Sequence, residues 1–152
     1  MKRRLFVAFL ACTLIVLTDV STGAADQPLG KLFIKAAKAK VDGQDFADQE
    51  LEDSVKDLKK RANKFLLVED ESQADFLLVV VKRETKAGQP SLMKHKTPRN
   101  VNDLHATISI KENEGWKPGV QLSTNGCCQF WTDAASKIMS EAEKWAKLQE
   151  KR

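Results

Sequence analysis

Two adjacent cysteines, Cys127 and Cys128, are the side chains of this sequence best suited to covalent chemistry. Four uses are open to them: packing of one thiol in the core, a disulfide between the neighbours, pairing of an exposed thiol with another molecule, and metal binding. Zinc sites use spaced pairs of cysteines, which this sequence lacks. In a strand, consecutive side chains point to opposite faces, so that one thiol would be buried and the other exposed. We predict packing without catalysis at the end of the last strand, with the outer thiol available to join a homodimer.

No catalytic signature accompanies these thiols. A Cys–His nucleophile would have to recruit one of the two histidines, His95 or His105, and neither stands in a recognised motif. The C-x-x-C, H-E-x-x-H, G-x-S-x-G and P-loop motifs are missing from the sequence. The acidic run Glu69–Glu71 lies in a polar turn, where solvated carboxylates are expected. The sequence therefore predicts no catalytic residue, no cofactor and no metal, and the alternative is a thiol-dependent redox or enzyme-like protein that uses Cys127 and Cys128.

A polar, basic insert at about residues 84–104 is the second functional candidate. Loops on a rigid scaffold often carry binding residues. A basic loop suits an anionic partner such as a lipid headgroup, a glycan or an acidic protein surface. A solvated loop without a partner is the alternative. The candidate contacts are Lys82, Arg83, Lys86, Lys94, Lys96 and Arg99.

Residues 1–25 have the three parts of a secretory signal peptide. The basic stretch Lys2–Arg4 precedes an apolar run, Leu5–Leu17, and small residues follow up to Ala25. The apolar run is shorter than the roughly 20 residues that a membrane span needs, although an uncleaved anchor is the alternative. The residues before Cys12 resemble a lipobox, but the apolar run continues beyond that cysteine and no polar tether follows. We expect cleavage, and an exported protein that is periplasmic or extracellular and has no membrane span.

Removal of the leader changes the charge balance. The full chain has 25 Lys+Arg and 21 Asp+Glu, and the leader takes three bases and Asp19, so that 22 and 20 remain, a net charge of +2. The sequence pI of about 9.0 therefore reflects the leader in large part, and nucleic acid is not an expected partner. Residues 26–152 suffice for a single domain with one core. Only two cysteines remain in that domain, so its stability must come from packing.

The elements that position these residues follow from hydrophobic periodicity. This periodicity predicts a first strand at Leu32–Ile34 and then a helix over Phe46–Asn63, with Asp45 as its N-cap. Strands follow at Phe65–Val68 and Phe76–Val81. The six successive apolar residues of the latter suit a central strand that is covered on both faces.

The second half of the chain predicts two more strands and a helix. The alternating segment His105–Glu112 suits a strand with one wet face, and Val120–Asn125 a last strand. Thr132 is the expected cap of a final helix, Asp133–Glu150. The predicted fold is α/β, of an α+β-like kind: a single mixed sheet of about five strands with two amphipathic helices packed on one face. The predicted core includes Val55, Leu58, Leu78, Val80, Ile108, Ile138 and Trp145.

One phrase, FLLVEDESQADFLLVVV at residues 65–81, resembles small bacterial envelope domains of the TolB N-terminal, LpoB and CsgG-like type. In those domains a long helix precedes a strand, an acidic turn ending in Ala-Asp and a second apolar strand. The strand ATISIKE and the tryptophan-bearing last helix also fit, so that the resemblance covers most of residues 31–150. It implies a periplasmic or outer-membrane-associated domain that binds partners and has no active site. The sequence departs from that pattern in two ways: it lacks a convincing lipid-anchor cysteine, and its segment GCCQFW has no counterpart there.

These observations together predict a secreted or periplasmic, non-enzymatic domain. It would act through interaction with an envelope protein or an anionic surface.

Overall fold

The computed structural model describes residues 27–41, 44–46, 48–87, 99–113 and 115–151. The leader, Lys94, His95 and Lys96 lie outside these ranges, so the predictions made for them stay predictions. Across the described part of the chain, no helix is both long enough and apolar enough to cross a membrane.

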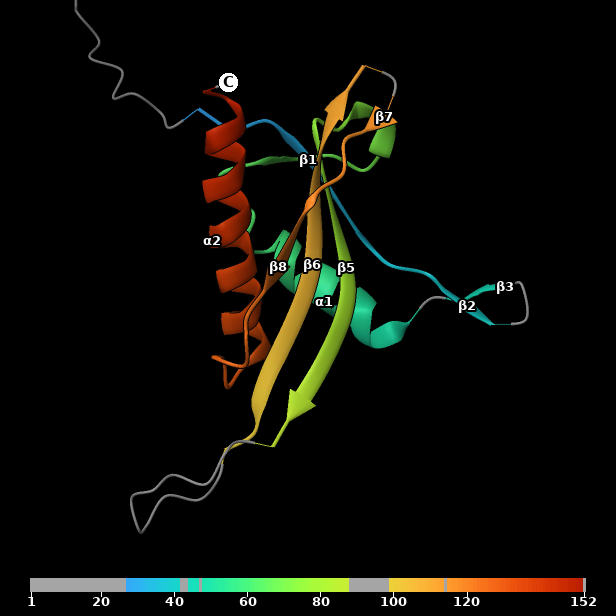
Figure 1. Cartoon of the computed structure of the whole chain (residues 1–152), viewed down its shortest axis with the longest axis vertical. Helices are drawn as coiled ribbons and strands as arrows, with labels where there is room; N and C mark the ends of the chain where they lie inside the picture. The colour runs from blue at the N-terminus through green and yellow to red at the C-terminus, as the bar shows by residue number, and fades with distance from the viewer. Residues whose placement is uncertain (1–26, 42–43, 47, 88–98, 114, 152) are drawn as a thin grey trace, which may run out of the picture.

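A mixed sheet forms the scaffold of the domain (Figure 1). Its strand order is β4-β1-β5-β6, and β7 and β8 both pair with β6. β1 is parallel to β4 and β5, whereas the pairs formed by β6 are antiparallel. The strands of this sheet are β1 (Lys31–Ala36), β4 (Leu66–Leu67), β5 (Phe76–Lys86), β6 (Val101–Glu112), β7 (Gly115–Trp116) and β8 (Val120–Ser123).

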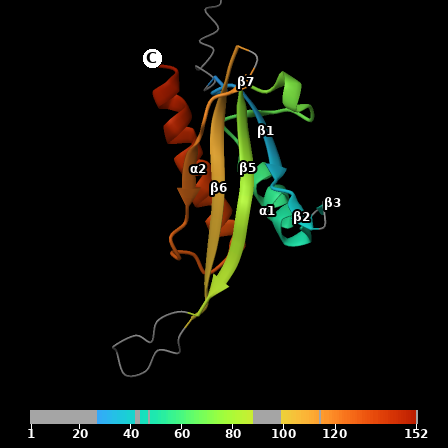
Figure 2. The same cartoon turned by 45° about the vertical axis from the view of Figure 1, so that its right-hand side comes forward.

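Two helices, α1 (Gln49–Lys59) and α2 (Trp131–Gln149), pack against the sheet and against each other. α1 contacts β1 and β5, and α2 contacts β6 and β8. Figures 1 and 2 show both helices on the same face of the sheet. The predicted α/β fold with two helices on one face is thereby confirmed. The opposite face, against which neither α1 nor α2 packs, is called the open face below.

The start of α1 differs from the prediction. Its N-cap is Asp48, whose side chain accepts a hydrogen bond from Glu50 N at 2.9 Å. Asp45, the predicted cap, lies instead in a short hairpin, β2 (Ala39–Val41) paired with β3 (Gln44–Phe46). This hairpin was not predicted, because its strands, at 3 residues each, are too short for a periodic pattern to show.

The start of α2 is also different. Its N-cap is Phe130, which has extended backbone angles (φ −115°, ψ 147°) and makes no side-chain cap bond. An N-cap needs this extended backbone, and Thr132 is already helical, so the prediction of Thr132 as the cap was wrong. Ala134 N donates to Phe130 O at 3.1 Å and so closes the first turn without a capping side chain.

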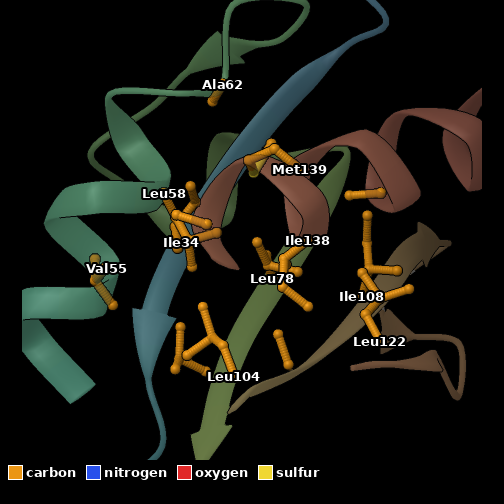
Figure 3. Close-up of a cluster of buried hydrophobic side chains, with 14 of the residues drawn as sticks. Ile34, Val55, Leu58, Ala62, Leu78, Leu104, Ile108, Leu122, Ile138 and Met139 are labelled. Carbon is orange, nitrogen blue, oxygen red and sulfur yellow. The ribbon is translucent and has the colours of Figure 1, made fainter. Parts of the chain in front are cut away.

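A continuous apolar core lies between the sheet and the helices (Figure 3). Six of the seven core residues predicted from the sequence are no more than 6% exposed. The seventh, Trp145, is partly buried and meets the ring of Phe76 edge-on at a centroid distance of 6.2 Å. The six are Val55, Leu58, Leu78, Val80, Ile108 and Ile138.

β5 is central, as predicted, but its side chains on the open face are buried only at the start of the strand. Leu77 is 6% exposed, whereas Val81 is 49% exposed beside a break in register between Val80 and Lys82. The prediction of cover on both faces was therefore wrong for the second half of the strand. β5 and β6 also extend into the segment expected to be a loop, because Glu84 pairs with Asp103 and Lys86 with Val101 across the hairpin.

Candidate functional site

The two cysteines lie at the corner between β8 and α2. A turn with positive φ at Asn125 (51°) and Gly126 (65°) reverses the chain immediately after β8. Cys127 is exposed, Cys128 is buried, and their Sγ atoms lie 2.6 Å apart. The structure thus places one thiol towards the core and the other towards solvent, in contact with each other.

A lysine of α2 reaches this corner. Lys137 Nζ lies 3.3 Å from Cys127 Sγ and donates to Thr124 O at 3.0 Å. An ammonium at this distance stabilises a thiolate electrostatically. Burial, together with the contact with Cys127, raises the pKa of Cys128 to about 11. The two thiols therefore differ in character, since the exposed one has a cationic neighbour and the buried one is held protonated.

The corner is fastened to the start of β6. Asn102 N donates to Cys128 O at 2.6 Å, and Asn102 Nδ2 donates to Gln129 O at 2.8 Å. Asn102 itself is 9% exposed. Its backbone and side chain thus hold the two consecutive peptide groups that follow Cys128, so that a change at the thiols acts directly on β6.

The Cys–His pairing considered from the sequence is not formed by the described histidine. His105 Nε2 lies instead near two carboxylates, 3.4 Å from Asp103 Oδ2 and 3.8 Å from Glu84 Oε1. His105 stands opposite Ser123 in β8. The cationic neighbour of the exposed thiol is Lys137, which lies ten residues further along the chain. No pattern in the sequence indicates this contact.

A buried carboxylate, Asp103, is the centre of an ionic network on the open face. It is 2% exposed and accepts hydrogen bonds from Lys86 Nζ and Thr124 Oγ1, each at 2.8 Å. Burial acts to raise the pKa of Asp103, but the bonds from Lys86 and Thr124 outweigh it and hold that pKa well below the ordinary value. The same bond to Asp103, together with one to Glu84, raises the pKa of Lys86 to about 12.

Three groups of this network are of the kinds that bind metals. Ligand atoms of Glu84, Asp103 and His105 all lie within 4.8 Å of one another. However, Lys86 Nζ lies 2.7 Å from Glu84 and 2.8 Å from Asp103, and Lys82 Nζ lies 2.6 Å from Glu84. The two ammonium groups already balance the two carboxylates, so a metal would have to displace a lysine. The arrangement fits a self-neutralised network better than a metal centre.

The sequence did not reveal this network, because Glu84 and Asp103 fall within the segment that was expected to be a loop. The pairing of Glu84 with Asp103 follows from the register of the β5–β6 hairpin. Extending the alternation of His105–Glu112 backwards by a few residues would have placed Asp103 and His105 on one face.

The predicted anion contacts are held by internal partners where the structure describes them. Arg83 lies over the ring of Trp131, 4.0 Å from its centroid, and donates to Glu50 O at 3.0 Å. Lys82 and Lys86 pair with acids of the network, and Arg99 Nη1 donates to Gln129 Oε1 at 3.4 Å. Arg83 therefore ties β5 to both helices, and these four side chains do not form a single basic patch.

The open face carries a hollow of about 390 Å³ between β5, β6 and β8. Exposed Val81 forms one wall, and Thr107 and Gln121 supply polar groups opposite. β8 forms the rim and pairs only with β6 among the described strands. The lining residues are Val81, Lys82, His105, Ala106, Thr107, Gln121, Leu122 and Ser123.

No family model matches this sequence, and no curated protein matches it. Among solved structures, a minor lipoprotein from Acinetobacter baumannii is similar over 82% of this chain and 95% of that chain. The TM-score is 0.43 and the sequence identity is 14%. A likeness of this size carries no argument about function, and no family is assigned to the chain.

Proposed function

We propose that this protein is an exported, non-enzymatic binding domain of the cell envelope. We further propose that it binds an extended segment of a partner protein, which adds as a strand to the free edge of β8. The observation that supports this reading is the uncharged outer edge of β8 beside the hollow of the open face. Export is supported by the leader predicted at residues 1–25.

The hydrogen-bonding pattern gives β8 an outward-facing backbone. Thr124 N donates to Leu104 O at 3.2 Å, so that this pair is a hydrogen-bonded one in the antiparallel ladder. The pattern alternates along the strand, which directs the N–H and C=O groups of Gln121 and Ser123 away from β6. An extended peptide is the ligand that matches such a row of donors and acceptors.

The side chains of β8 leave this edge accessible. Free edges are normally protected by charges, by proline or by bulges. The sequence of β8, VQLS, contains neither a charge nor a proline. Alternate side chains of an added strand would project over the open face, where Val81 offers an apolar contact and Gln121 offers an amide. We therefore expect a partner segment that alternates apolar and polar residues.

An anionic surface is the weaker candidate. The described basic side chains Lys82, Arg83, Lys86 and Arg99 have internal partners, which compete with an external anion. The proposal of an anionic partner then depends on Lys94 and Lys96.

A crosslinking experiment tests the strand-addition proposal. A photo-crosslinking amino acid at Ser123 should capture one envelope protein, and the same group at Ser140, exposed on α2, should not. Gln121→Pro removes an outward N–H and should abolish the adduct. Gln121→Ala retains that N–H and is the matched control. Equal capture in both variants, or capture from Ser140 alone, would contradict strand addition.

Affinity and processing complete the test. A peptide from the captured segment should bind Gln121→Pro at least about tenfold more weakly than Gln121→Ala, a difference of about 1.4 kcal/mol. N-terminal sequencing of the exported protein should start at Ala25 or Asp26. An intact Met1 on exported protein would contradict cleavage and support an anchor.

A further inference from the structure

We propose that Cys127 and Cys128 form a redox-active dithiol that closes an intrachain disulfide between the two neighbours. The Sγ atoms already lie 2.6 Å apart, inside the contact distance of two unbonded sulfurs. Beyond residue 12 the sequence has no other cysteine with which either could pair within the chain. The proposal is independent of strand addition at β8.

The two thiols have the unequal environments that a stepwise oxidation needs. Cys127 is exposed and has Lys137 Nζ at 3.3 Å, so that it is the thiol that attacks an external disulfide as a thiolate. Cys128 is 6% exposed and its pKa is raised by burial, so that it meets external reagents poorly but has Cys127 in contact. Cys127 is thus the attacking thiol and Cys128 the resolving one.

The oxidant is a low-molecular-weight disulfide, RSSR. In the first step the Cys127 thiolate attacks one sulfur of RSSR, a mixed disulfide forms and RS⁻ departs. In the second step Cys128 gives up its proton to solvent and attacks Cys127 Sγ, which forms the Sγ–Sγ bond and releases a second RS⁻. Two electrons pass from the cysteines to RSSR, and both RS⁻ ions take up the two protons that the cysteines lost.

The hydrogen bonds of the corner carry this change into the sheet. Asn102 donates to Cys128 O from its backbone at 2.6 Å and to Gln129 O from its side chain at 2.8 Å. Ring closure must rotate the peptide group between the cysteines and move the adjoining carbonyl groups. The exchange rate of the Asn102 amide hydrogen should therefore report the redox state.

Glutathione titration provides the test. The purified protein is equilibrated with glutathione and its disulfide at several ratios, acid-quenched, alkylated and weighed intact. We expect the two alkylation sites to disappear together, at monomer mass and with the loss of two hydrogens. The amide of Asn102 should change its exchange rate at the same ratio.

Variants assign the roles of the two thiols. Cys128→Ser or Cys128→Ala should retain one glutathione on Cys127, because the resolving thiol is missing. Lys137→Gln should slow alkylation of Cys127 several-fold, whereas Lys144→Gln, which changes an exposed lysine elsewhere on α2, should not. Three outcomes would overturn the proposal: two alkylatable thiols at every ratio, a glutathione adduct that persists in the unaltered protein, or a disulfide-linked dimer in place of the intrachain bond.

Discussion

Replacement of Asp103 by asparagine is the sharpest test of the ionic network. The side chain is 2% exposed and accepts from Lys86 and Thr124 at 2.8 Å. Asparagine keeps the shape, but it removes the charge and turns an amide donor towards groups that are themselves donors. Loss of a charge-assisted hydrogen bond costs about 1.5–3 kcal/mol, and an unsatisfied buried group costs about 1–3 kcal/mol. Because Lys86 can regain water, we expect a loss of about 2–3 kcal/mol at neutral pH.

The effect of Asp103→Asn should also depend on pH. The folded pKa of Asp103 is lowered from the ordinary value of 3.8. A lowered folded pKa means that the carboxylate contributes stability above the unfolded pKa, and that this contribution is lost as the pH falls towards the folded pKa. The difference in the free energy of unfolding between the original protein and the variant should shrink below about pH 4, by up to about 1.4 kcal/mol per pH unit.

Urea unfolding followed by tryptophan fluorescence measures both effects, at about pH 7 and about pH 3.5. The matched control is Glu141→Gln, which removes the same charge from an exposed pair with Lys144. The control should change the free energy of unfolding by less than about 0.5 kcal/mol. An equally small change for Asp103→Asn, or a loss that does not shrink in acid, would refute the proposed role of this network.

Three further predictions concern the core, the arginine over the tryptophan ring and the alkaline limit. Leu58→Ala should cost about 2–5 kcal/mol in urea unfolding because Leu58 is 0% exposed, whereas Leu148→Ala, at 61% exposed, should cost under about 0.5 kcal/mol. A cost below that limit for Leu58→Ala would mean that α1 does not cover the sheet. Arg83→Lys should lower stability by about 1–2 kcal/mol, because it loses the stacking on Trp131 and the bond to Glu50 O. An unchanged unfolding midpoint would contradict the role of Arg83 in joining the helices to β5. The pKa of Lys86 is raised from 10.5 to about 12. Its contribution to the free energy of unfolding should therefore be lost as the pH rises from about 10.5 through 12. The variant Lys86→Met should not show this loss.

The parts of the fold that depend on buried periodicity were predictable. The stripe of Val55 and Leu58, the run at Phe76–Val81 and the alternation at Ile108 set the helix and strand types, because burial imposes these periods on the sequence. Element ends were less predictable. Asp45 and Asp48 are equally good caps by residue type, and only the hairpin that occupies Asp45 decides between them.

The candidate site was predictable only in part. The cysteines and His105 are recognisable by chemical type, and their place near the last strand follows from local pattern. The approach of Lys137 to Cys127 and of Lys86 to Asp103 depends on how α2 and the β5–β6 hairpin pack. Such contacts join polar residues, whose sequence positions carry no periodic signal, and they become visible only in three dimensions.

The place of β1 in the sheet has a consequence for the order of folding. β1 is the first strand of the sheet in the chain, but both of its neighbours, β4 and β5, lie downstream, and its register with β5 joins Leu32 to Phe76. When the chain emerges N-terminus first from a ribosome or a translocation channel, β1 has no partner in the sheet until β4 and then β5 follow. The consecutive strands β5 and β6 need only each other and can pair as a hairpin at once. The first strand out therefore waits for two strands that lie far downstream, so that the leading part of the chain lacks its partners in the sheet until β4 and β5 have followed it.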